Sequence, residues 1–73
     1  MRTAVFKSYK NGYFRFWLEN GEELAFEEVH PRVLKQFDLK NDKSLVDKEF
    51  KMAFVEDEDG DDVIYRVQSL KPL

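Results

Sequence analysis

Hydrophobic and polar residues alternate through most of the first 27 positions, which is the pattern of half-buried β-strands. The alternation is interrupted at two Asn-Gly pairs, Asn11-Gly12 and Asn20-Gly21. An Asn-Gly pair between alternating runs is the strongest short-range signal for a β-hairpin. We therefore predict three antiparallel strands over residues 3–9, 13–18 and 22–27.

The second hairpin has two possible loop lengths, and each places different residues on the two faces. A two-residue loop of Asn and Gly alone would put Leu24 on the face opposite Phe16, and neither face would then be apolar. A three-residue loop over residues 19–21 pairs Phe16 with Leu24 instead. Its last residue, Gly21, would take the left-handed conformation. We adopt this loop because it gathers the apolar residues on one side.

The first hairpin supports the same division into faces. A three-residue loop over residues 10–12 pairs Tyr9 with Tyr13 and Val5 with Trp17. The two hairpins then agree, and agreement between independent local signals supports the assignment. The predicted inner face is Ala4, Phe6, Phe14, Phe16, Leu18, Leu24 and Phe26. The predicted outer face is Val5, Lys7, Tyr9, Tyr13, Arg15, Trp17 and Ala25.

The hydrophobic period changes after residue 29. Val33, Leu34 and Phe37 have the spacing of one side of a helix. Pro31 suits the first helical position, so we predict a helix of about two turns over residues 30–37. The polar segment that follows, to Lys48, is expected to be a loop whose few apolar residues cover one end of the core.

Two further strands are predicted in the last third of the chain, over residues 50–54 and 63–67. A four-residue loop over residues 57–60, with its glycine in the left-handed conformation, would pair Phe54 with Val63. The full order is then three strands, one short helix and two strands.

This order predicts a mainly β fold, a five-stranded OB-fold-like barrel with one short helix between the third and fourth strands. An SH3-like barrel is the alternative, although it usually lacks a helix at this point. With 73 residues, the chain is expected to form a single domain over residues 1–73. The phenylalanines expected in the core are Phe6, Phe14, Phe16, Phe26, Phe50 and Phe54.

Residues 14–37 contain the run Phe14-Arg15-Phe16-x-Leu18-Glu19-Asn20-Gly21, and Val29-His30-Pro31 leads into the predicted helix. A charged hairpin and the run Val63-Ile64-Tyr65-Arg66 follow. In these features, about half of the chain resembles the small OB-fold RNA-binding domains typified by bacterial translation initiation factor one. The resemblance implies an OB-fold barrel that binds RNA.

Composition narrows the function classes. The chain has no cysteine, which excludes a disulfide framework and a cysteine metal site and favours a reducing, cytoplasmic setting. No apolar run approaches the roughly 20 residues of a membrane span, so we expect no membrane partner. The net charge of −3 argues mildly against tight non-specific binding to nucleic acid.

The predicted outer face is the best candidate for a binding site. Aromatic side chains of Tyr9, Tyr13 and Trp17 alternate there with Lys7 and Arg15. Aromatic rings stack on bases and basic groups follow the phosphates, so this face could bind single-stranded nucleic acid, in particular RNA. The same aromatic residues could bind a protein partner, or could simply stabilise the sheet as cross-strand pairs in a structural domain.

No residue pattern indicates catalysis, and we expect a non-enzymatic protein without cofactor. The acidic run 56–62 does not match a calcium-binding EF-hand loop, because Val55 and Arg66 would occupy the first and last ligand positions. His30 is the only histidine and has no nucleophile motif nearby. We predict neither catalytic nor metal-binding residues.

Overall fold

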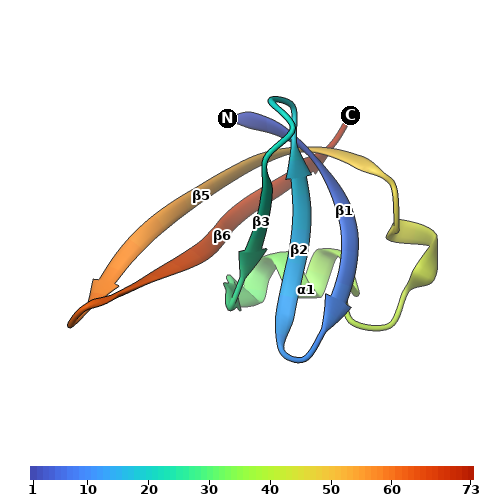
Figure 1. Cartoon of the computed structure of the whole chain (residues 1–73). Helices are drawn as coiled ribbons and strands as arrows, with labels where there is room; N and C mark the ends of the chain where they lie inside the picture. Colours follow the sequence, from blue (N-terminus) through green and yellow to red (C-terminus); the bar gives the residue numbers. More distant parts are fainter.

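The computed structural model describes residues 1–73, with the exception of the Asp59 side chain (Figure 1). The protein is mainly β, with one sheet and one short helix. The elements in chain order are β1 (Arg2–Lys10), β2 (Tyr13–Leu18), β3 (Glu23–Phe26), β4 (Glu28–Val29), α1 (Pro31–Gln36), the 3-10 turn η1 (Lys43–Leu45), β5 (Glu49–Asp59) and β6 (Asp62–Pro72).

The strands lie side by side in the order β3-β2-β1-β5-β6-β4. All neighbours are antiparallel except β4 and β6, which are parallel. The edge strands β3 and β4 are separated in the chain only by Glu27, so the sheet must curve until its two edges approach each other. The sequence predicts five strands and the structure has six, because the two-residue β4 is too short to produce an alternation.

The β2–β3 hairpin has the predicted register. Phe16 lies opposite Leu24, and Phe14 lies opposite Phe26. The loop has three residues, and its last residue, Gly21, has the predicted positive φ of +88°. The Gly21 amide donates a hydrogen bond of 3.0 Å to the carbonyl oxygen of Leu18. The requirement that one face of the hairpin be apolar therefore predicted the correct loop length.

The β1–β2 hairpin differs from the prediction near its turn. The loop is Asn11-Gly12, with φ of +54° and +83°, and two positive values suit a two-residue turn whose twist matches that of the strands. Tyr9 therefore lies opposite Phe14, not Tyr13. A β-bulge between Phe6 and Ser8 supplies one extra residue, Lys7, and restores the predicted register beyond it.

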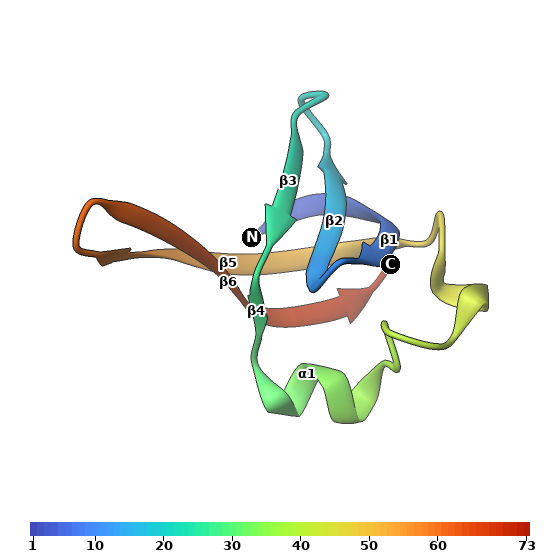
Figure 2. The same cartoon turned by 60° about the horizontal axis from the view of Figure 1, so that its bottom comes forward.

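The β5–β6 hairpin also differs from the prediction. Its loop is Gly60-Asp61, and Phe54 lies opposite Val67 rather than Val63. Gly60 has the predicted positive φ, +65°, but within this shorter loop. The two strands form a ribbon that extends away from the rest of the molecule (Figures 1 and 2). This register buries Val67 in the core, and it leaves Glu56, Glu58, Asp61 and Asp62 exposed in the extended part.

The core lies inside the curved sheet. Phe16 and Phe26 are fully buried and their rings meet edge to face, with centroids 5.7 Å apart. Five of the six predicted phenylalanines are buried, and Phe54 is half-buried at the base of the ribbon. The helix forms as predicted: the His30 side chain accepts a hydrogen bond of 3.1 Å from the Arg32 amide and Pro31 is the first helical residue. Helix α1 lies across the open side of the curved sheet (Figure 2).

Candidate functional site

The outer face of β1, β2 and β3 carries the largest exposed aromatic side chains of the chain. Strand β2 alternates strictly, so Phe14, Phe16 and Leu18 are buried while their neighbours face solvent. Trp17 is 50% exposed and Tyr13 is 41% exposed. The members of this outer face are Val5, Lys7, Ser8, Lys10, Tyr13, Arg15, Trp17, Glu23 and Ala25.

Lys7 and Trp17 form the centre of the outer face. The Lys7 ammonium nitrogen lies 4.7 Å from the centroid of the Trp17 ring, within the range of a cation–π interaction. The same ammonium group forms an ion pair with Asp47. Lys7 reaches both groups because it is the extra residue of the β-bulge, where the strand bends.

Arg15 lies between Tyr13 and Trp17 along β2 and is paired across the strands with Ala25. Its guanidinium is 3.4 Å from the Glu23 carboxylate on β3. Both groups are about half exposed, so this ion pair is weak and easily exchanged for another partner.

Tyr9 is not part of the outer face. Because the turn has two residues, Tyr9 pairs with Phe14 and their ring centroids are 4.5 Å apart, with Tyr9 half-buried against the core. Its ring instead carries the Lys40 ammonium group, which is 5.6 Å from the centroid. Of the five residues predicted for the site, the structure brings together Lys7, Tyr13, Arg15 and Trp17 only.

The structure adds residues that the prediction did not include. Lys10 lies opposite Tyr13, and Ser8 lies opposite Arg15. The signal that could have placed them was the Asn11-Gly12 pair itself, since Asn-Gly favours a two-residue turn. A bulge at Lys7 has no comparable sequence signal.

Charge is distributed unevenly over the molecule. Six of the seven residues from 56 to 62 are acidic, and the remaining twelve basic and nine acidic residues leave the rest of the chain with a net charge of +3. We call residues 56–65 the acidic arm. Because the arm extends away from the body, its negative charge lies apart from the outer face (Figure 2). The net charge of −3 is therefore the sum of a strongly acidic arm and a basic body.

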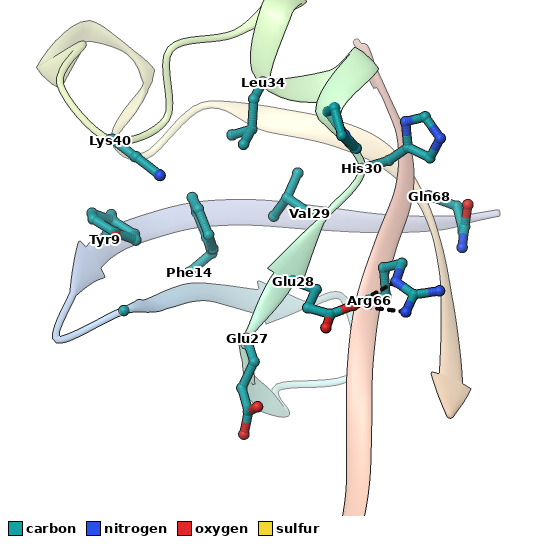
Figure 3. Close-up of a pocket in the computed structure, with 12 residues that line it drawn as sticks. Tyr9, Phe14, Glu27, Glu28, Val29, His30, Leu34, Lys40, Arg66 and Gln68 are labelled. Atoms are coloured by element: carbon teal, nitrogen blue, oxygen red, sulfur yellow. Dashed lines mark hydrogen bonds and ion pairs between the residues drawn. The ribbon is translucent and has the colours of Figure 1, made fainter. Parts of the chain in front are cut away.

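A pocket of about 540 Å³, here the helix pocket, lies between the β1–β2 turn, β4, β6 and α1. Tyr9 and Lys40 lie at one end of it and Arg66 and Gln68 at the other (Figure 3). Arg66 is paired with Glu28 at 2.7 Å and with Asp57 at 2.9 Å. The hydrogen bond and charge of Glu28, followed by the charge of Asp57, raise the pKa of Arg66.

Two other features bear on the kind of site, a grouping of metal-ligating side chains and a membrane-spanning helix. Among the side chains that the structure describes, no three His, Asp or Glu residues are grouped as a metal site would require. The described helices do not include one with the length and apolar character needed to cross a membrane.

Comparison with known protein families, with curated proteins and with solved structures finds no match for the chain.

Proposed function

We propose that the protein is a small non-enzymatic module that binds single-stranded nucleic acid, RNA in particular, through its outer face. The observation that carries the proposal is the pair of exposed aromatic residues, Trp17 and Tyr13, on one face of β2 with Arg15 between them. Every base offers a flat ring for stacking, and each stacked base contributes about 1–3 kcal/mol.

The charge distribution supports this proposal. The outer face carries Lys7, Lys10 and Arg15 against Glu23, and the body as a whole is basic. A phosphate group of the nucleic acid could replace the Glu23 carboxylate as the partner of the Arg15 guanidinium. The replacement would cost little free energy, because the existing ion pair is exposed. The acidic arm repels phosphate and would direct a bound strand away from β5 and β6.

We further propose that the curved sheet is a barrel of the OB type, with the protein located in the cytoplasm. The approach of β3 and β4 at the two edges of the sheet supports the barrel, and OB-folds bind oligonucleotides on the corresponding face. The absence of cysteine suits a reducing compartment.

The test is an NMR titration of the labelled protein with mixed-sequence single-stranded RNA at low salt. We expect amide shifts along β2 and at Lys7, and we expect quenching of the single tryptophan on stacking. Trp17→Ala should weaken binding by about 1–3 kcal/mol. The control is Lys35→Ala, an exposed change on α1 that should leave the affinity unchanged. Amide shifts absent from β1 and β2 with excess RNA would refute the proposal.

A protein partner is the second candidate, and one observation favours it. Lys7, which lies over the Trp17 ring, and Arg15, two residues away on β2, are already paired with Asp47 and Glu23, so these charges beside the indole are balanced. Exposed aromatic residues in neutral surroundings are typical of protein interfaces. Salt separates the two candidates, because binding to nucleic acid weakens steeply as salt rises whereas binding through the aromatic rings does not.

A further inference from the structure

A second pocket, of about 460 Å³, lies between β1 and the segment 39–46, and we call it the loop pocket. Its volume is in the range of small-molecule sites, about 300–1,000 Å³. Its lining includes Phe6 and Leu39, both buried, and the half-buried Tyr9. The pocket therefore offers apolar side chains and two aromatic rings, of which Tyr9 is the more exposed.

Three lysines line the loop pocket: Lys7, Lys40 and Lys43. The one carboxylate in its lining, Asp42, is engaged by Ser44, whose hydroxyl donates at 2.6 Å and whose amide donates at 3.0 Å. Within the described side chains, Lys40 and Lys43 have no carboxylate partner. The ammonium group of Lys43 is thus available to an anionic ligand, and that of Lys40 has only the Tyr9 ring to leave.

The helix pocket, on the other side of Tyr9 and Lys40, has a different charge. Glu27 and Glu28 line it together with Lys40 and Arg66, and Glu28 is paired with Arg66, while Lys40 lies at the other end (Figure 3). An anionic ligand is therefore favoured in the loop pocket and disfavoured in the helix pocket, although the two pockets share Tyr9 and Lys40.

The loop pocket is continuous with the outer face through Lys7. This side chain covers the Trp17 ring and also lines the loop pocket. The second half of β1 has no strand neighbour on this side, because β5 pairs only with Arg2 to Val5. A strand stacked on Trp17 can therefore pass the free side of β1 without meeting another strand of the sheet.

We infer that the loop pocket holds one nucleotide of the bound strand. Its base would replace the Lys40 ammonium group on the Tyr9 ring, and its phosphate would lie between Lys40 and Lys43. An aromatic ring next to cationic groups is complementary to a ligand that joins a flat ring to an anion, which describes a nucleotide. The inference rests on the proposed function, because it continues the strand that the outer face would bind.

The experiment compares the wild-type protein with the double variant Lys40→Ala, Lys43→Ala, both exposed positions where substitution preserves the core. The probes are an eight-nucleotide single-stranded RNA and free uridine monophosphate, followed by amide NMR and by Trp17 fluorescence. We expect shifts in residues 39–46 with the RNA. In the double variant, the slope of log affinity against log salt should fall by about 0.7 for each phosphate that the protein no longer neutralises. Lys35→Ala is the matched control.

The outcomes separate the failure of one proposal from the failure of the other. Shifts in both β2 and residues 39–46, with weaker binding by the double variant, support both. Shifts in β2 alone, with unchanged affinity and salt slope in the double variant, overturn the loop pocket and leave the proposed function standing. Shifts in residues 39–46 with uridine monophosphate, but none in β2 with RNA, support a nucleotide pocket and overturn strand binding by the outer face. The absence of amide shifts with both the RNA and uridine monophosphate would overturn both proposals.

Discussion

The Lys7 ammonium group lies between the Trp17 ring, whose centroid is 4.7 Å away, and the carboxylate of Asp47. Both interactions are near the surface, where a cation–π contact contributes about 0.5–1 kcal/mol and an ion pair about as much or less. Asp47 has a φ of +69°, which Asp and Asn tolerate better than most other residues. The position of the Lys7 charge is therefore set by residues from two distant parts of the chain.

Replacing Asp47→Asn should strengthen binding to single-stranded RNA. Asn keeps the shape and the backbone conformation of Asp47 but removes the charge that competes with phosphate for Lys7. We expect higher affinity at low salt, with a salt slope steeper by about 0.7 for one additional neutralised phosphate. Fluorescence titration at several salt concentrations measures both quantities. Affinity equal to or below that of the wild type would contradict this use of Lys7.

Replacing Phe16→Ala should destabilise the fold by about 3–5 kcal/mol. Phe16 is 0% exposed and packs against the rings of Phe6 and Phe26, so truncation removes burial and leaves a cavity. Urea denaturation measures the change. Trp17→Ala, at the neighbouring exposed position, is the control and should cost much less; equal costs for the two variants would contradict the assignment of faces.

Replacing Gly21→Val should cost about 1–2 kcal/mol through backbone strain. Its φ of +88° lies in the left-handed region, where a Cβ atom comes too close to the backbone. A Cβ atom at Gly21 would meet no other atom within 4 Å, so packing adds nothing to this cost. Gly21→Asn should be milder, since Asn tolerates this conformation. Thermal unfolding of both variants measures which is the less stable. A Val variant as stable as the Asn variant would contradict the prediction.

Replacing Ser44→Ala should raise the pKa of Asp42. Hydrogen bonds from the Ser44 hydroxyl and amide lower this pKa in the folded protein. A lowered folded pKa stabilises the protein above the unfolded pKa of Asp42, and this contribution is lost as pH falls through the folded pKa. The variant keeps only the hydrogen bond from the residue-44 amide, so the contribution to stability should be smaller and its loss should be complete at a higher pH. An NMR titration of the Asp42 carboxyl carbon measures this, and an unchanged pKa would contradict the role of the hydroxyl.

Neutralising two charges of the acidic arm, with Glu58→Gln and Asp61→Asn, should strengthen RNA binding at low salt only. The arm acts at a distance, and the molecule is 36 Å long, whereas the screening length is about 8 Å at 0.15 M salt. The gain should therefore vanish at physiological ionic strength. Affinity measurements at two salt concentrations decide the matter. A gain of equal size at both would indicate that the arm contacts RNA directly.

The sequence by itself determined the features that depend on neighbouring residues. Alternation along 13–18 assigns Phe16 to the core and Trp17 to the surface, because side chains on a strand point to opposite faces. The positive φ of Gly21 follows from the loop that this alternation requires. Pro31 and the spacing of Val33 and Leu34 predict α1 for the same reason, since capping and helical periodicity are local properties.

Only the tertiary structure decided the features that depend on distant residues. Tyr9 is not on the outer face because a two-residue turn and a bulge at Lys7 together keep Phe6 opposite Phe16. The Asn-Gly pair favours such a turn, but no local signal predicts the bulge that makes the turn compatible with this register. The β5–β6 register was chosen by burial of Val67 against the core rather than by the acidic turn. Pairing of β4 with β6 and the gathering of Lys7, Lys40 and Lys43 at one pocket likewise follow from packing between segments far apart in the chain. The chain adopts this packing because it buries the most apolar surface. That total depends on all segments together, so it cannot be read from the residues of one segment.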